Sequence, residues 1–387
     1  QLPLNRVKLC QDFPCCPGHE GIQKGRADGN GFRQVIKHGG QPVLLRLILG
    51  KGPWRCLINI LVASSENVEN LRHGICHTQL LHLGIRLLEE GASVTLVDSL
   101  IPEYGGNPAN IRGYESRLKV NISDVRDPHS MKTLVKGHDF LFNLAGQTSH
   151  MDSMADPYTD LDINCKAQLS ILEACRNANP GIRIVFAGTR QIYGKPDYLP
   201  VDENHPVRPV DVNGINKMAG EWYHILYNNV YGIRACSLRL TNTIGPRMRI
   251  KDARQTFLGV WIRQVLTGKP FEVWGGEQLR DFTYADDCVD AMMRAALHEE
   301  AFGQIFNIGG GKRISLRDLA DLLVDTAGEG AYEVREYPAD RKKIDIGDYY
   351  ADDSRLRSLL GWEPRTQLRD GLRQIIDYYR PRLQDYL

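Results

Sequence analysis

The 387-residue sequence has no apolar run that approaches the roughly 20 residues of a membrane-spanning helix. It also lacks an excess of charge, since 48 Lys and Arg residues face 47 Asp and Glu residues and leave a formal net charge of +1. This balance argues against a strongly basic surface for nucleic acid, and no basic block with interleaved aromatic residues stands out. We therefore expect neither a membrane nor a nucleic acid as a partner.

Cysteine and histidine pairs with the spacing of a zinc site are also missing. Cys10, Cys15, Cys16 and His19 lie close together, but no second Cys/His pair follows at zinc-finger spacing, so no metal site is predicted. The nine cysteines are an odd number, and most stand singly in apparent helices and strands. Residues 1–20 show neither the basic start nor the apolar stretch of a secretory signal. These features predict a reducing, cytoplasmic environment.

From about residue 56 the sequence alternates between short β-rich runs and longer helical patterns. The predicted strands are 56–63, 93–98, 140–144, 182–187 and 234–240, and the predicted helices between them are 80–90, 162–176 and 213–229. Such alternation predicts an α/β fold with a doubly wound, Rossmann-like parallel sheet whose ligands bind at the carboxyl ends of the strands. From about residue 245 the alternation loosens, which predicts a smaller C-terminal α+β substrate domain.

The predicted domain boundaries follow from these patterns. Residues 1–53 form an atypical N-terminal extension without sustained periodicity, and residues 54–245 form the cofactor-binding domain, with a contribution from about 280–300. Residues 246–387 form the substrate domain.

Asp98 ends the apolar run Thr95-Leu96-Val97-Asp98. In dinucleotide-binding folds, an acid after the second strand accepts hydrogen bonds from the ribose hydroxyls of the cofactor. Because its charge disfavours a 2′-phosphate, Asp98 predicts NAD rather than NADP.

Further motifs occur downstream in a fixed order. They are Asp124-Val125, Asn143-Leu144-Ala145-Gly146, the run 189–194 (Thr-Arg-Gln-Ile-Tyr-Gly), Lys217, the run 239–247 (Arg-Leu-Thr-Asn-Thr-Ile-Gly-Pro-Arg), and the runs 280–284 and 360–364. Each motif is weak alone. Together they resemble the extended short-chain dehydrogenase/reductase superfamily, in its NAD-dependent nucleotide-sugar epimerase/dehydratase branch, over about residues 83–387.

This resemblance implies roles for individual residues. Thr189 matches the catalytic Ser/Thr that hydrogen-bonds the reacting sugar oxygen, and Lys217 matches the lysine that binds the nicotinamide ribose. The implied cofactor contacts also include Gly74, Asp98, Asp124, Val125, Asn143, Ala145 and Gly146. A nucleotide-diphosphate sugar is implied as the substrate, held by Tyr193, Asn242, Arg280 and Arg341, and the planar fork of arginine suits phosphate oxygens.

One departure from the family pattern concerns the catalytic base. The family places its catalytic tyrosine four residues before the lysine, on the same face of the helix, and here that position is Asn213. An amide does not ionise in the useful range, so Asn213 cannot act as a phenolate base. Three candidates for the proton acceptor stay open: Lys217 itself, a water held by Thr189 and Asn213, or another residue such as Tyr193.

A second departure concerns the glycine-rich loop that carries the pyrophosphate. Its three glycines are expected at positions 74, 77 and 80, where the sequence has Gly74, His77 and Leu80. Residues 1 to about 82 differ from the family so strongly that they resemble a shifted reading frame, and poor NAD affinity is expected if the sequence stands as written.

The lead hypothesis for function is a nucleotide-sugar epimerase that acts at sugar C4 by transient oxidation with bound NAD. Family 4,6-dehydratases carry acidic residues directly after the active-site Thr, whereas Arg190 and Gln191 follow Thr189 here. The alternatives are another dehydratase or oxidoreductase of the branch, or a catalytically silent sugar-nucleotide binder. The apolar positions of the Lys217 helix are expected to be mostly core, with part of them available for a homodimer interface: Ile215, Met218, Trp222, Ile225 and Leu226.

Overall fold

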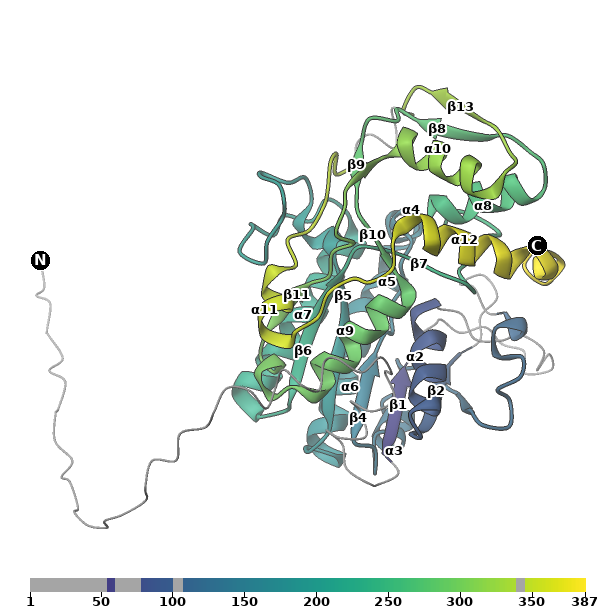
Figure 1. Ribbon diagram of the computed structural model, residues 1–387. Helices are drawn as coiled ribbons and strands as arrows, with labels where there is room; N and C mark the ends of the chain where they lie inside the picture. Colours follow the sequence, from purple (N-terminus) through teal and green to yellow (C-terminus); the bar gives the residue numbers. More distant parts are fainter. Residues whose placement is uncertain (1–53, 60–77, 100–106, 339–344) are drawn as a thin grey trace, which may run out of the picture. The chain divides into compact units, whose positions relative to one another are not determined.

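A seven-stranded parallel sheet forms the centre of the chain (Figure 1). The computed structural model describes residues 54–59, 78–99, 107–338 and 345–387, which all belong to one compact unit, Ile48–Leu387. The strands run in the order β11-β6-β5-β4-β1-β2-β3, and every pair in the sheet is parallel. Their bounds are β1 Arg55–Asn59, β2 Ser93–Asp98, β3 Lys119–Ile122, β4 Phe140–Asn143, β5 Arg183–Thr189, β6 Ala235–Leu240 and β11 Ile305–Asn307.

The central strands are apolar almost throughout because helices cover both faces of the sheet. All residues of β4 are buried, and only the two end residues of β5 are partly exposed. Helices α2 (Thr78–Glu89) and α9 (Ala285–Leu297) pack together, while α6 (Ala167–Ala178) packs against both α3 (Pro128–Leu134) and α7 (Val212–Tyr231). The strand order reverses direction between β1 and β4, which is where doubly wound sheets bind their ligands.

Two capping interactions fix the ends of α7, the helix that carries Lys217. The Asp211 side chain accepts a 2.7 Å hydrogen bond from the backbone N–H of Gly214, which satisfies a free donor of the first turn. Gly232 ends the helix in the left-handed conformation at φ 68°, which suits glycine because it has no Cβ atom.

Past β6, a second group of elements surrounds a separate apolar cluster that includes Leu258, Phe271, Leu319 and Leu372. The elements are α8 Phe257–Leu266, β8 Phe271–Trp274, α10 Leu316–Ala327, β13 Tyr332–Arg335 and α12 Leu368–Tyr379. Four short strands form two further pairs outside the main sheet. Strand β7 (Asn242–Ile244) pairs with β10 (Phe282–Tyr284), and β9 (Leu279–Arg280) pairs with β12 (Ile314–Ser315). The remaining helical segments are α4 His150–Ala155, α5 Pro157–Leu161, a π-helical turn Asp162–Lys166, η5 Arg190–Tyr193 and α11 Ser354–Leu360, with short 3₁₀ turns at Pro108–Ile111, Glu299–Ala301 and Arg380–Asp385.

The structure confirms the predicted fold class, and β2 has the predicted bounds. It also places β1 in the sheet between β2 and β4, although the family resemblance was recognised only from about residue 83. The edge strand β11 and the helices α11 and α12 were not predicted. The division at residues 245 and 246 stays a prediction, and the extension 1–53 lies outside the described residues.

One expectation for α7 is wrong. Ile215, Trp222 and Leu226, which were expected to be mostly core, are about half exposed, and only Ile225 of that set is buried. The helix packs against β5, β6 and the helices α4, α5 and α6, and within the described ranges these three apolar side chains stay about half exposed.

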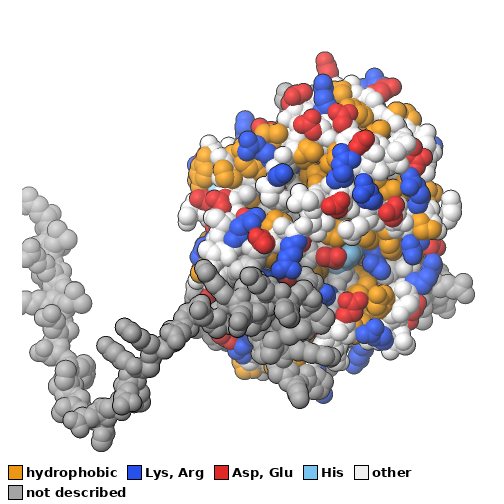
Figure 2. Space-filling model, in the orientation of Figure 1, with side chains coloured by type: hydrophobic (Ala, Val, Ile, Leu, Met, Phe, Trp, Pro, Cys, Tyr) orange, Lys and Arg blue, Asp and Glu red, His pale blue; other side chains and the backbone are white. Residues whose placement is uncertain are grey.

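Charged side chains of both signs are interspersed on the visible face of the molecule (Figure 2), in keeping with the near-zero net charge. Within the described ranges, no helix is long and apolar enough to cross a membrane, and no group of three or more potential ligands could hold a metal ion. The cysteine-rich segment around Cys10 is not among these residues.

Candidate functional site

Thr189 and Lys217 lie on elements that pack against each other. Thr189 is the last residue of β5, at the carboxyl end of the sheet, and its hydroxyl caps η5 by accepting a 3.2 Å hydrogen bond from the backbone N–H of Gln191. Lys217 lies in α7, which packs against β5 and η5. The carboxyl end of a parallel sheet is the usual ligand side of this fold, and Thr189 lies there with the helix of Lys217 packed beside it.

Lys217 is a buried cation. The residue is only 6% exposed, and its Nζ atom lies so close to Gly146 that a Cβ atom at position 146 would collide with it. The same Nζ is 5.6 Å from the centre of the Phe186 ring. Burial lowers the pKa of Lys217 to about 8, and the charge of Asp160 opposes this shift. A substantial fraction of the side chain is therefore neutral just above physiological pH.

Asn213 is held by a buried polar network. Its Nδ2 atom donates to the backbone oxygen of Gln147 at 2.8 Å, to Gln147 Oε1 at 3.2 Å and to Asp160 Oδ2 at 3.0 Å. The Asp160 carboxylate also accepts hydrogen bonds from Asn164 at 3.0 Å and from Asn216 at 2.8 Å. Three amides thus satisfy one buried carboxylate, and Asn213 has a structural role in holding it.

Tyr193 is part of a different buried network. Its hydroxyl donates to Asn307 Oδ1 at 2.7 Å and accepts from Arg239 Nη1 at 2.5 Å, while Arg239 forms a 2.7 Å ion pair with Glu221. Burial raises the pKa of Tyr193 to about 12 against the influence of Arg239. Because its hydroxyl already bonds Asn307 and Arg239 and its pKa is raised, Tyr193 is a poor candidate for the base that accepts the proton of the sugar hydroxyl.

The predicted cofactor residues of β2 and β4 lie at the carboxyl ends of neighbouring strands. Asp98 ends β2 and is buried, and Gly146 follows β4 beside Lys217. Asn143 is also buried, and its Nδ2 atom is 2.7 Å from Gln168 Oε1 and 3.1 Å from His224 Nε2. Asn143 therefore ties β4 to α6 and α7.

The remaining cofactor residues include Val125, which is fully buried, and Ala145, whose backbone oxygen accepts a hydrogen bond from Gln168. The Asp124 carboxylate is paired with Arg126 at 2.5 Å. Gly74, expected in the glycine-rich loop, lies outside the described residues, as does Arg341 of the substrate set.

Two of the predicted substrate residues take part in hydrogen bonds within the protein. Arg280 is buried, and its Nη1 atom donates to the backbone oxygens of Leu279 and Gly347, while Nη2 is 3.4 Å from Asp345. Asn242 accepts a 3.1 Å hydrogen bond from Arg190 Nη2 and donates to the backbone oxygen of Asp281 at 3.0 Å.

Sequence reasoning missed two residues at this site. Asp160 gave no signal because no motif marks it, and only the tertiary fold brings Asn213 and Asn216 to the carboxylate that Asn164 reaches from the next helical turn. Arg190 was noted only because it stands where related dehydratases have an acid. Arg190 directly follows Thr189 at the carboxyl end of β5, and this position could have marked it as a residue of the site.

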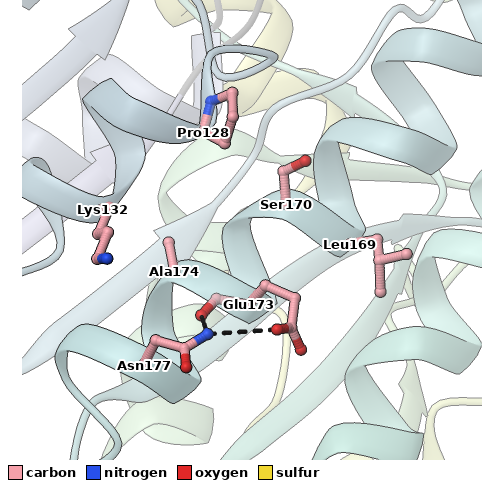
Figure 3. A pocket seen from close by; sticks show the side chains of 7 residues that line it. All are labelled: Pro128, Lys132, Leu169, Ser170, Glu173, Ala174 and Asn177. Atoms are coloured by element: carbon pink, nitrogen blue, oxygen red, sulfur yellow. Dashed lines mark hydrogen bonds between the residues drawn. The ribbon is translucent and has the colours of Figure 1, made fainter.

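A groove of about 350 Å³ lies elsewhere, on the outer faces of α3 and α6 (Figure 3). Its lining includes Lys132, Leu169 and Glu173, and none of the predicted site residues contributes to it. This groove is therefore distinct from the candidate site.

Comparison with known proteins shows the family of the chain. The model of the NAD dependent epimerase/dehydratase family matches residues 82–309, more than half of the chain. The chain belongs to this family. A Methanocaldococcus jannaschii protein that bears the provisional name UDP-glucose 4-epimerase is 31% identical over 302 residues, covering 77% of this chain and 94% of that protein.

Solved structures of family members have the same fold. The UDP-glucose 4-epimerase of Thermotoga maritima, solved with UDP-glucose, superposes with a TM-score of 0.73 at 25% identity, over 85% of this chain and 99% of that one. The UDP-glucuronic acid 4-epimerase of Bacillus cereus, solved with UDP-glucuronic acid and NAD, gives a TM-score of 0.71 at 25% identity, over 84% and 99% of the two chains.

The family uses NAD, and the described residues fit that cofactor. An acid ends β2, and the absence of a Cβ atom at Gly146, just after β4, makes room for the Lys217 head itself; both lie at the carboxyl side of the sheet. Asp98 would hold the adenosine ribose and Lys217 the nicotinamide ribose.

Proposed function

We propose that the protein is an NAD-dependent nucleotide-sugar epimerase that inverts the configuration at C4 of the sugar. The observation that carries this proposal is the placement of Thr189 at the end of β5 against the helix of Lys217, with Arg190 rather than an acid following the threonine. Elimination of water from the sugar needs an acid to protonate the leaving hydroxyl, and Thr189 is followed by none.

In this mechanism NAD, which Asp98 and Lys217 would hold, would supply the hydride acceptor for oxidation at C4 and the hydride donor for the reduction that inverts it. The Thr189 hydroxyl hydrogen-bonds the C4 oxygen and holds it in place. Neutral Lys217 accepts the proton of that hydroxyl, either directly or through Thr189, and returns it when the sugar is reduced again. A lysine whose pKa is about 8 suits this task, because efficient acid–base groups have pKa values near the working pH.

The proposal is tested by incubating the full chain with UDP-glucose and NAD and following UDP-galactose by NMR. Wild-type protein should equilibrate the two sugars, Thr189→Ala should lower the rate by about 10²- to 10⁴-fold, and Lys217→Met should abolish it. Thr133→Ala, at an exposed threonine of α3, is the matched control and should leave the rate unchanged. Formation of a 4-keto-6-deoxy sugar instead would contradict epimerisation and favour a dehydratase of the same family.

A second candidate is a catalytically silent binder of sugar nucleotides. The commitment of Asn213 to Gln147 and Asp160 favours it, because no phenol stands beside Lys217 in α7. Intact binding of UDP-glucose without turnover over a wide pH range would support this candidate over the enzyme.

We also propose that the chain forms a homodimer through the exposed side of α7. Ile215, Trp222, Leu226 and Val230 are spaced at intervals of four or seven residues and are each about half exposed or more. A stripe of this kind on a long helix is typical of a surface that packs against a second helix.

A further inference from the structure

Three buried polar atoms without a hydrogen-bond partner occur on Arg190, the residue after Thr189, and on two side chains that influence it. They are Nη1 of Arg190, the hydroxyl of Tyr349 and Oδ1 of Asp281. Buried polar atoms are nearly always hydrogen-bonded, so an unpartnered cluster needs an explanation, and a polar ligand is one. These atoms come from distant parts of the chain. Arg190 lies in η5, Asp281 lies between β9 and β10, and Tyr349 lies in the segment after Gly347.

The Arg190 guanidinium is fixed in place by its neighbours. Its Nη2 atom donates to Asn242 Oδ1 at 3.1 Å, and its central carbon lies 5.1 Å from the centre of the Tyr349 ring. Asn242 is in turn held by the backbone oxygen of Asp281. The guanidinium is therefore held in one orientation, in which Nη2 donates to Asn242 and Nη1 has no hydrogen-bond partner. This arrangement is expected for an arginine that binds a ligand.

Arg190 also lacks a counter-ion among the described residues, since no carboxylate lies within ion-pair distance of it, and Asp281 acts on it only from further away. Arg280 forms an ion pair with Asp345 and hydrogen bonds with two backbone oxygens. Arg190, in contrast, is repelled by the positive charge of Arg280. Burial and this repulsion lower the pKa of Arg190 to about 10. A cation held at such a cost in free energy is stabilised when an anion binds beside it.

We propose that Arg190 binds an anionic oxygen of the sugar nucleotide through its free Nη1 atom. This inference rests on the proposed function and extends it to the recognition of the substrate. Thr189, Arg190 and Asn242 are each partly exposed while Tyr349 and Asp281 are buried, so of the three residues with unpartnered atoms Arg190 is the one nearest the surface on the Thr189 side.

Two sources of that oxygen share this chemistry: the diphosphate, and a carboxylate on the sugar. A guanidinium one residue from Thr189 is close to the sugar, and its bond to Asn242 places it close to a residue expected at the diphosphate. Binding measurements with three ligands separate the two sources.

The experiment is isothermal titration of the NAD-loaded full chain with UDP, UDP-glucose and UDP-glucuronic acid, for wild type and Arg190→Gln. If Arg190 binds the diphosphate, the variant should bind all three ligands about 10- to 100-fold more weakly. If it binds a sugar carboxylate, only UDP-glucuronic acid should lose this affinity. Equal affinities of wild type and variant for all three would overturn the inference and leave the proposed function standing.

Controls separate recognition from folding. Because Arg190 is repelled by Arg280, Arg190→Gln should leave the melting temperature unchanged or raise it, which a structural arginine would not do. Arg190→Lys keeps a charge without the planar fork and should lose a smaller part of the affinity, so it carries the test if the glutamine variant fails to fold. Arg208→Gln, at an exposed ion pair with Asp197, should bind like wild type. Failure of the wild type to bind any of the ligands would overturn the inference and the proposed function together.

Discussion

Replacement of Lys217 by methionine is expected to stabilise the folded protein at neutral pH while it abolishes activity. In the folded chain the pKa of Lys217 falls from 10.5 to about 8, because burial penalises the charged form. This difference corresponds to about 3 kcal/mol of unfavourable free energy below pH 8, where the side chain is charged in both states. Methionine has a similar shape and no charge to bury.

The sign of the pH dependence follows from the same shift. Between pH 8 and pH 10.5 the unfolded chain keeps the Lys217 proton and the folded chain loses it, so the stability of the wild type rises with pH across this window. The stability advantage of Lys217→Met should therefore be about 3 kcal/mol at pH 7 and should shrink towards zero near pH 10.5. Asp160 keeps its three amide donors in the variant, which limits the secondary cost.

Urea unfolding of both proteins without added cofactor measures this difference at pH 7, 9 and 10.5. Lys195→Met removes one exposed lysine as a control, and its stability at pH 7 should stay within about 0.5 kcal/mol of the wild type. The reasoning is refuted if Lys217→Met is less stable than the wild type at pH 7, or if its advantage does not change with pH.

Three further perturbations test other parts of the structure. Glu221→Gln leaves the buried Arg239 without its anion and should cost about 3–5 kcal/mol in urea unfolding. Asn213→Asp places a second carboxylate beside Asp160, so it should destabilise by on the order of 3 kcal/mol at pH 7, and the loss should shrink as the pH falls and one carboxyl takes up a proton. Trp222→Glu on the exposed side of α7 should convert a dimer to a monomer in analytical ultracentrifugation with little change in the melting temperature of the monomer; a dimer that persists would contradict the proposed interface.

Much of the sheet was predictable because its central strands are buried on both faces and are therefore mostly apolar. The bounds of β2 were predicted to the residue, and those of β4 and β6 to within one residue. The three-residue strand β11 was missed, since so short a run has no period of its own and becomes a strand only by pairing with β6. The exposed side of α7 was misjudged for a related reason: periodicity shows that residues share a helix face, but not what that face contacts.

The sequence by itself determined the family, the NAD cofactor and the order of the motifs, because these depend on residue types at fixed spacings. It also showed that Asn213 stands where a tyrosine was expected, but left three candidates for the base. Only the tertiary structure reduced them, by joining Tyr193 to Arg239 and Asn307, and by burying Lys217 beside Asp160 and Gly146. Burial, charge proximity and hydrogen-bond partners arise between residues far apart in the chain, so the pKa of a site and the free nitrogen of Arg190 are properties of the fold rather than of any motif.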